Sequence, residues 1–305
     1  MKGVDGMQRS ILGNTRQRLK RGIAEFAINM PSKILSEQAL TRYYVCLSRP
    51  ASAVLSREAR LVGTTALRIP PEFSALGLSS TPVRVKCTDG TWTVQDAERV
   101  SRLLFGIYGM KRAIYDAYRL REIDVPTEGV VIDVGANVGE FSSLFLNTKV
   151  RVLSFEPDPY VCSILRINID APNIEVHEEA LSNQDGTAEL AIASATADSS
   201  LLHGVGGQAS VPVEALRLDR VLDREAIERV QLLKMDAEGF EPEVLEGLGE
   251  RIRDVERITV DVGPERHGES SSDAVTRILI DAGFHVSHPA EGRRQVLLAR
   301  NRLLL

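Results

Sequence analysis

The residues best suited to chemistry begin with a turn at 131–141, where the chain reads VIDVGANVGEF. Gly135 and Gly139 allow the backbone to approach a ligand closely and to adopt a positive φ. The helix expected after the turn offers free N–H groups to an anion, and an amino-acid carboxylate suits that position. Asp133 stands before the turn and could accept a hydrogen bond from an ammonium group. Because such an acid would repel a pyrophosphate, this DxGxNxG spacing favours a ligand other than a dinucleotide.

A second acid, Glu156, ends the next expected strand in the segment 153–159, LSFEPDP, 21 residues after Gly135. A carboxylate about 20 residues beyond such a glycine turn commonly accepts hydrogen bonds from ribose hydroxyls. The alternative is an acid that only begins a helix. Since the strand, the turn and the spacing agree, the pattern favours ribose binding.

The third group is the segment 232–241, LLKMDAEGFE, in which a lysine and three acids cluster at the carboxyl end of a strand. Ligands of open α/β sheets bind at that edge. We expect this strand to lie beside the first one, which would bring Asp236 near Asp133 and the bound ligand. Asp236 and Glu238 are the candidates for a general base, and Lys234 for orienting a carboxylate or a second substrate.

Other polar residues are weaker candidates. Helix-start capping is the alternative role for Glu238 and Glu241. His267 and His203, each in an expected loop, could reach a second substrate, although a loop histidine is more often solvated. Two acids on one turn are too few to define a metal site, so no metal is expected.

The elements that must position these residues form a regular alternation from residue 129 onward. It predicts a doubly wound α/β domain over 129–305, with a mostly parallel sheet and helices on both faces. The expected strands are 130–134, 151–155, 174–177, 231–235 and 258–262. The expected helices are 140–146, 159–169, 219–229, one from 241 and 272–282. Two antiparallel pairs are also expected, 187–193 with 210–213 and 284–287 with 295–299.

Ahead of this domain, residues 76–128 read as a hairpin at 83–94 and a helix at 95–121 that lead into the core. For residues 1–75 the sequence predicts a basic helical extension. Within 1–60, eleven Lys or Arg residues outnumber four acids, which gives +7 against −12 for the remainder. This extension could contact an anionic membrane surface. The plainer interpretation, which we prefer, is a solvated arm that covers the catalytic domain or a partner subunit.

Composition narrows the class of protein further. A net charge of −5 and 5% aromatic residues argue against a nucleic-acid binder. Three cysteines, far apart and without a CxxC pair, argue against a disulfide framework and a zinc site. With no signal-peptide pattern and no apolar run of about 20 residues, we expect a cytoplasmic protein, with contact at the inner face of the membrane as a further option. Nothing in the sequence indicates the oligomeric state.

Taken in order, three motifs resemble those of the FkbM family of S-adenosylmethionine-dependent methyltransferases: the D-x-G-A-N-x-G turn, then F-E-P, then K-x-D-x-E-G. Asn168 and the segment 180–182 resemble the stretches between them. The resemblance covers about 130–300 and implies a class I methyltransferase fold, Rossmann-like in its sheet. Two positions depart from the pattern: Arg217 stands where members often carry Thr, and Asp261 where the fifth strand usually carries Glu.

The resemblance also implies S-adenosylmethionine as the cofactor and transfer of its methyl group to an oxygen. The implied binding residues are Asp133, Gly135, Asn137 and Gly139 at the methionine end, Glu156 at the ribose, and Ala180 and Leu181 near the adenine. The favoured acceptor is a sugar hydroxyl or carboxylate on a saccharide or lipid-linked glycan, and a polyketide-like metabolite is the alternative. Two other classes remain: an NAD-dependent oxidoreductase, which the turn does not favour, and a non-catalytic scaffold with the same fold.

Overall fold

The computed structural model describes residues 61–67, 81–192, 201, 210–266, 268–287 and 294–304. The chain divides into two compact units, one made of 1–69 and 80–110 and the other of 70–79 and 111–305. The predicted basic segment at 1–60 lies outside the described residues. None of the described helices is long and apolar enough to cross a membrane.

The first unit contains a three-stranded antiparallel sheet of β1 (Leu61–Ala66), β2 (Val83–Cys87) and β3 (Gly90–Val94). The register of β2 and β3, with Val83 opposite Val94, confirms the predicted hairpin. The single helix predicted over 95–121 is wrong. Left-handed backbone at Gly106 and Arg119 interrupts it, so the segment forms η2 (Glu98–Leu103), α4 (Gly106–Ala117) and η3 (Leu120–Glu122).

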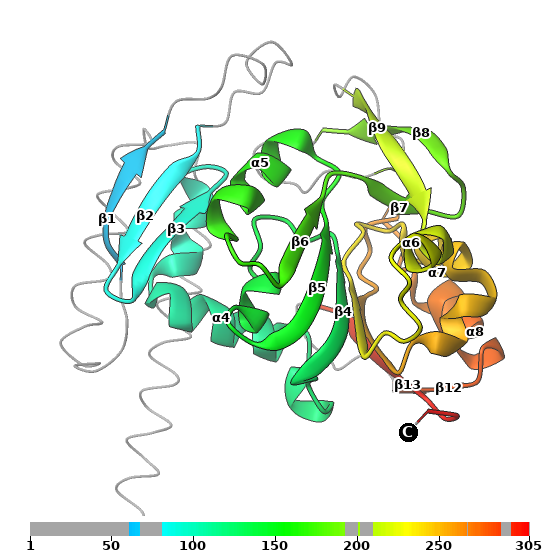
Figure 1. The fold of residues 1–305 in the computed structure, drawn as a ribbon. Helices are drawn as coiled ribbons and strands as arrows, with labels where there is room; N and C mark the ends of the chain where they lie inside the picture. The colour runs from blue at the N-terminus through cyan, green and yellow to red at the C-terminus, as the bar shows by residue number, and fades with distance from the viewer. Residues whose placement is uncertain are drawn as a thin grey trace, which may run out of the picture. The chain divides into compact units, whose positions relative to one another are not determined.

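The second unit is built on a seven-stranded sheet of order β12-β13-β11-β10-β4-β5-β6 (Figure 1). Its strands are β4 (Glu128–Val134), β5 (Lys149–Phe155), β6 (Ile174–His177), β10 (Leu232–Met235), β11 (Arg257–Asp261), β12 (Phe284–Ser287) and β13 (Val296–Asn301). β13 runs antiparallel to its neighbours β11 and β12, and the other six strands all run in one direction. This architecture confirms the predicted doubly wound α/β fold. The chain progresses outward from β4 in both directions, so the switch point where such sheets bind ligands lies at β4 and β10.

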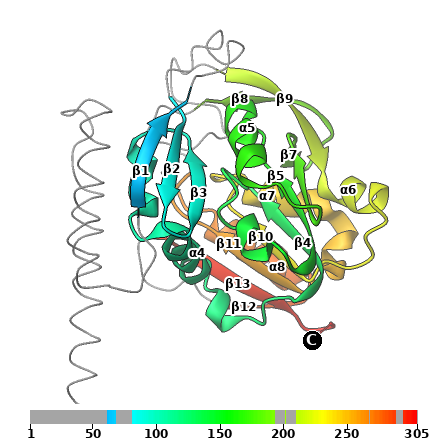
Figure 2. The same cartoon turned by 60° about the vertical axis from the view of Figure 1, so that its left-hand side comes forward.

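Helices α5 (Pro159–Asn168), α6 (Leu218–Arg224), α7 (Glu241–Leu248) and α8 (Ser272–Asp281) pack on this sheet. Figures 1 and 2 show α6, α7 and α8 together on one side of it. Leu222, Leu245 and Leu279 from these helices share one buried cluster with Ile132 of β4. Val131, which points to the opposite face, is also fully buried. Because both faces are covered, the parallel strands are nearly continuous apolar runs in the sequence.

Two predicted helices are shorter than expected. The helix expected at 140–146 is only the 3-10 turn η4 (Ser142–Phe145), because Gly139 at φ +93° delays its start. The helix expected at 219–229 ends with α6 at Arg224, where left-handed Ala226 follows. By contrast α5 and α8 confirm the helices predicted at 159–169 and 272–282. A further 3-10 helix, η5 (Gly249–Asp254), follows α7.

The inserted strand pair is confirmed as part of a small separate sheet. It has the order β7-β9-β8, formed by β7 (Ala180–Ser182), β8 (Gly186–Ala191) and β9 (Ser210–Arg217). β8 and β9 are antiparallel, with Leu190 opposite Val211. Most of the connection between them, including His203, lies outside the described residues.

Candidate active site

The turn after β4 follows a path that only a glycine permits. Gly135 has φ +68°, and a Cβ added there would lie 1.9 Å from the carbonyl oxygen of Asp236. The turn therefore passes directly against the end of β10. Asn137 is also left-handed, at φ 52°, and its Oδ1 accepts a hydrogen bond from Val138 N at 2.9 Å. From α5, Asn168 Nδ2 donates to Val138 O at 2.9 Å and fixes the far side of the turn.

Gly139, the second glycine of the turn pattern, lies against the end of α5. Its φ is +93°, and an added Cβ would lie 2.6 Å from Ile169 Cγ1 and 2.8 Å from Leu165 Cδ1. Gly139 thus lets the chain pack closely on the end of α5, while Gly135 lets it pack on β10. Both are residues that the sequence pattern singled out.

Asp133 and Lys234 form a buried ion pair beneath this turn. The two residues lie opposite each other in the register of β4 and β10, which confirms the predicted neighbourhood of the strands. Asp133 Oδ1 is 2.9 Å from Lys234 Nζ, and the two side chains are 0% and 3% exposed. Asp133 Oδ2 accepts a hydrogen bond from Ser142 Oγ at 2.5 Å. The structure thus places Asp133 behind the turn rather than on its open surface.

The remaining contacts of Lys234 also go to the turn. Its Nζ donates to Val134 O at 2.9 Å and to Gly135 O at 2.7 Å. Two protons of the ammonium group are thus donated to the turn, while its charge lies against Asp133. As the structure stands, Lys234 holds the backbone of the turn rather than facing outward.

Glu156 connects the turn to the end of β5. Its carboxylate accepts hydrogen bonds from Asn137 N at 2.8 Å and Asp158 N at 3.0 Å. Burial, and secondarily the charge of Asp158, raise the pKa of Glu156 to about 8. A buried carboxyl group whose partners are uncharged N–H groups retains acceptor capacity for further donors, as ribose binding requires.

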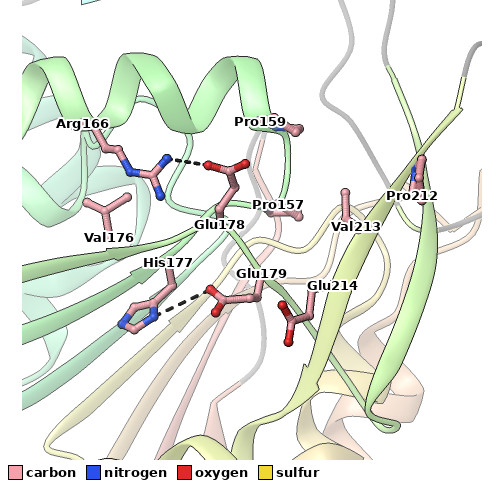
Figure 3. Close-up of a pocket in the computed structure, with 10 residues that line it drawn as sticks. All are labelled: Pro157, Pro159, Arg166, Val176, His177, Glu178, Glu179, Pro212, Val213 and Glu214. Atoms are coloured by element: carbon pink, nitrogen blue, oxygen red, sulfur yellow. Dashed lines mark hydrogen bonds and ion pairs between the residues drawn. The ribbon is translucent and has the colours of Figure 1, made fainter. Parts of the chain in front are cut away.

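Beyond Glu156 lies a pocket of about 390 Å³. Figure 3 shows its lining residues, which are Pro157, Pro159, Arg166, Val176, His177, Glu178, Glu179, Pro212, Val213 and Glu214. Arg166 pairs with Glu178 at 2.5 Å, and the His177 ring stacks on Phe155 with 4.7 Å between the ring centroids. The wall combines apolar side chains with carboxylates, which suits a flat heterocycle that carries an amino group.

Ala180 and Leu181 do not line that pocket. They are 2% and 3% exposed, respectively, within β7, and their side chains belong to the buried clusters of the protein. The pocket wall on the same stretch of chain is instead His177 to Glu179. The adenine contact expected of Ala180 and Leu181 stays a prediction.

On the other side of the switch point, Asp236 follows β10. Its Oδ2 accepts hydrogen bonds from the Tyr118 hydroxyl at 2.5 Å and from Arg294 Nη1 at 2.8 Å. Burial alone would raise the pKa of Asp236, but the charges of Arg294 and Lys234 and the hydrogen bond from Tyr118 outweigh burial and lower it. Among the described residues no contact is recorded for Oδ1. Two donors therefore hold Oδ2, and Oδ1 is available to a ligand.

Arg294 joins this carboxylate to a second one. Its Nε lies 3.0 Å from Asp261 Oδ2 at the end of β11, and its guanidinium lies 5.0 Å from the centroid of the Tyr118 ring. Asp261 Oδ1 accepts from Gly263 N at 3.2 Å. Burial, followed by the nearby Asp236, raises the pKa of Asp261 to about 6. Two carboxylates with pKa values shifted in opposite directions therefore share one guanidinium.

The two glutamates after Asp236 have different surroundings. Glu241, the first residue of α7, is fully buried and accepts hydrogen bonds from Ala237 N, Gly239 N and Ser271 Oγ at 2.9–3.0 Å, so it fastens the turn that precedes the helix. Glu238 lies within the turn, partly exposed, with left-handed backbone at φ 50°.

Sequence reasoning missed Tyr118 and Arg294. Tyr118 follows a helix and Arg294 precedes β13, each far along the chain from the motifs, and neither has a spacing signal. Asp261 was noticed only as a departure from a family pattern. His267 lies outside the described residues. Within the part of the chain that the structure describes, no group of three or more His, Cys, Asp or Glu residues could hold a metal ion.

Comparison with known proteins identifies the family. The methyltransferase FkbM domain matches residues 133–286, which is half of the chain. The chain belongs to the FkbM methyltransferase family. It is therefore an S-adenosylmethionine-dependent methyltransferase, as the sequence motifs predicted.

Curated relatives of this FkbM protein include the hexuronic acid methyltransferase AglP of Haloferax volcanii, 26% identical over 63% of this chain and 76% of the relative. Methyltransferase sdnD of Sordaria araneosa is 28% identical over 54% of this chain and 76% of its own. The AMB antimetabolite synthetase AmbE of Pseudomonas aeruginosa is 29% identical over 56% of this chain, which spans only 10% of that synthetase.

Among solved structures, the FkbM chain is similar to magnesium protoporphyrin IX methyltransferase from Synechocystis PCC 6803. The identity is 12%, with a TM-score of 0.39, over 67% of this chain and 83% of that one. A likeness of this size indicates nothing about the acceptor. The fit of S-adenosylmethionine rests instead on this structure: the glycine turn that a Cβ would obstruct, the buried Glu156 and the pocket beyond it.

Proposed function

We propose that this FkbM methyltransferase methylates an oxygen of a saccharide, either free or linked to a lipid. The observation that carries this proposal is the pairing of two half-sites at the switch point. The turn and Glu156 form one on β4 and β5, and the Asp236 cluster forms the other on β10 and β11. The similarity to AglP, which is named for methylation of a hexuronic acid, supports a sugar acceptor.

On the cofactor side, Gly135, Asn137 and Gly139 would line the methionine end, Glu156 would accept hydrogen bonds from the ribose hydroxyls, and the pocket beyond would take the adenine. When bound, S-adenosylmethionine supplies an electrophilic methyl group on a sulfonium. Holding donor and acceptor in line can account for about 7–11 kcal/mol of barrier reduction. A rigid turn therefore matters as much as any single contact.

Asp133 and Lys234 act on this alignment as positioning residues. Lys234 holds the carbonyl groups of Val134 and Gly135, and Asp133 holds Lys234. In this proposal neither touches the reacting atoms. The expected direct contact between Asp133 and an ammonium group becomes an indirect one through the turn.

On the acceptor side, Asp236 would orient the sugar through its open Oδ1, with Glu238 beside it on the same turn. A carboxylate that Arg294 and Tyr118 keep ionised is a good hydrogen-bond acceptor and a weak proton acceptor. We therefore assign Asp236 to orientation rather than to the general-base role first considered for it.

A small secondary metabolite, including a polyketide-like one, is a second candidate acceptor. The similarity of this chain to a segment of the antimetabolite synthetase AmbE favours it.

The test is methyl transfer from S-adenosylmethionine labelled in its methyl group to defined acceptors: methyl β-D-glucuronide, methyl β-D-glucoside and a hydroxylated macrolactone. The proposal predicts labelled product, heavier by one methylene, from at least one glycoside. Turnover of the macrolactone alone would favour the metabolite. Tight cofactor binding without turnover of any probe would favour a non-catalytic scaffold.

A further inference from the structure

Glu265, on the loop after β11, has a buried carboxylate oxygen without a partner. Its Oε2 is inaccessible to solvent and accepts no hydrogen bond from the residues that the structure describes. An unsatisfied buried acceptor is destabilising and uncommon in folded proteins. Such an atom beside a candidate active site points to a donor that arrives with a ligand.

The loop that carries Glu265 is fixed against the acceptor side. Arg266 Nη1 donates to Gly239 O at 2.9 Å, and Arg266 Nη2 pairs with Glu243 of α7 at 2.7 Å. These contacts fasten the loop to the turn that follows Asp236. The carboxylate folds back over Gly263, where an added Cβ would lie 2.3 Å from Glu265 Oε1. Gly263 N in turn donates to Asp261.

From this placement we propose that Glu265 is a catalytic residue that accepts the proton of an acceptor hydroxyl, and that the methylated group is a hydroxyl rather than a carboxylate. This inference rests on the proposed function. As the acceptor oxygen bonds the methyl carbon and the carbon–sulfur electron pair is left on sulfur, Glu265 takes the hydroxyl proton and becomes neutral. A carboxylate acceptor has no proton to lose and would leave Glu265 unused.

The charges around Glu265 favour this role. Asp261 of β11, Asp236 after β10 and Glu241 of α7 repel a negative charge on it, and Arg294 offsets only part of that repulsion. In the recorded contacts Tyr118 donates to Asp236 and Lys234 of β10 pairs with Asp133, so neither faces Glu265. Burial, followed by these acids, raises the pKa of Glu265 to about 7. A general base works best with a pKa near the working pH, and Asp236 has the opposite shift.

The same charges disfavour an anionic acceptor group. A carboxylate brought to the open Oδ1 of Asp236 would also meet Asp261 and Glu265. The one described guanidinium in the cluster, that of Arg294, is already paired with two of these acids. A neutral hydroxyl can donate to Asp236 or Glu265 without this repulsion.

The first experiment follows Glu265 itself in the full chain with S-adenosylmethionine bound. Carbon-13 NMR of the glutamate side-chain carboxyls is recorded against pH for the wild type, Glu265→Gln and Glu269→Gln. Glu269 is an exposed residue of the same loop and serves as the matched control. We expect a resonance that titrates near pH 7, is absent in Glu265→Gln and persists in Glu269→Gln. If the resonance lost in Glu265→Gln titrates as an ordinary glutamate, the inference is overturned.

The second experiment uses methyl β-D-glucuronide, which carries both hydroxyls and a carboxylate. We expect an alkali-stable methyl ether as the product. Glu265→Gln should lower kcat by about 10²–10⁴-fold and remove the rise of kcat through pH 7, whereas Glu269→Gln leaves both unchanged. Affinity for S-adenosylmethionine, measured by calorimetry, should be the same in all three proteins. An alkali-labile ester, or wild-type kcat and pH profile in Glu265→Gln, would contradict the inference.

A different result would show that the proposed function, rather than the role of Glu265, is wrong. In that case wild-type protein binds S-adenosylmethionine but methylates neither glycoside, and the saccharide proposal is lost. The kinetic comparison is then repeated on the macrolactone, whose acceptor groups are hydroxyls, and the titration of Glu265 is unaffected by the choice of probe.

Discussion

Two buried carboxyl groups, at the ends of the two strands that flank β4, show how surroundings set their chemistry. The pKa of Glu156 is raised to about 8, because burial is opposed only by uncharged backbone donors and a distant lysine. The pKa of Asp236 is lowered, because the charges of Arg294 and Lys234 and the hydrogen bond from Tyr118 outweigh its burial. One group therefore changes protonation near neutral pH while the other stays ionised.

Glu156 makes the stability of the cofactor-free protein depend on pH. Its pKa is 4.5 as a free side chain and about 8 when folded. Unfolded chains therefore bind fewer protons between these values, and stability present below about pH 4.5 is lost as pH rises towards 8. We expect Tm to fall from pH 6 to pH 8, and to fall less in Glu156→Gln. Scanning calorimetry measures this dependence. If Tm changes with pH equally in the wild type and in Glu156→Gln, folding does not raise the pKa of Glu156.

The pair of Asp133 and Lys234 supports a second prediction. Lys234→Met leaves a buried charge on Asp133 without its partner and should cost about 3–5 kcal/mol in unfolding free energy. The double variant Asp133→Asn/Lys234→Met removes both charges and should recover part of that loss. Urea denaturation measures both. A double variant no more stable than Lys234→Met would mean that the pair is not what holds the turn.

At the scale of elements, the parallel strands and the pairing of β10 with β4 could be predicted from the sequence. Strands covered on both faces are apolar runs, and the run at 131–134 is unambiguous for that reason. Helix ends were less predictable. Ala226 and Arg119 interrupt helical patterns with left-handed backbone, although neither residue type signals such a conformation.

The close packing of the turn after β4 against the end of β10 supports a prediction at this scale. Gly135→Ala places a Cβ 1.9 Å from Asp236 O and should abolish cofactor binding and lower Tm. Gly283→Ala is the matched control, because Gly283 has φ +90° but nothing within 4 Å of an added Cβ. Calorimetric titration with S-adenosylmethionine distinguishes clash from backbone strain. If both variants bind the cofactor equally well, the close approach of turn and β10 is unimportant.

At the scale of the whole molecule, the candidate cofactor half lies within sequence motifs more fully than the candidate acceptor half does. Glu156 and the glycines lie within short motifs at a fixed spacing. Tyr118 and Arg294 reach Asp236 from positions 118 and 58 residues away along the chain, so only the folded structure brings them together. Glu265 was passed over for the neighbouring histidine because a loop glutamate carries no signal of burial.

The uneven charge of the chain supports a prediction at this scale. Residues 1–60 carry +7 and the remainder −12. If the basic segment contacts a membrane surface, the full chain should sediment with phosphatidylglycerol vesicles at low salt and be released by added salt, because such attractions are screened within about 10 Å at 0.1 M. Replacing Arg16, Arg18, Lys20 and Arg21 by alanine should reduce binding. A chain that stays in solution at low salt supports the solvated arm instead.

The central claim is that Glu156 and the glycine turn hold S-adenosylmethionine, and calorimetric titration of cofactor into wild type, Glu156→Gln and Glu128→Gln tests it. Glu128 lies at the opposite end of β4 and is exposed. Since ribose hydroxyls donate to the ionised carboxylate, wild-type affinity should rise by up to about tenfold from pH 6 to 7 and again to pH 8. Glu128→Gln should behave identically, and Glu156→Gln should bind weakly without this pH dependence. Wild-type affinity in Glu156→Gln would contradict the account.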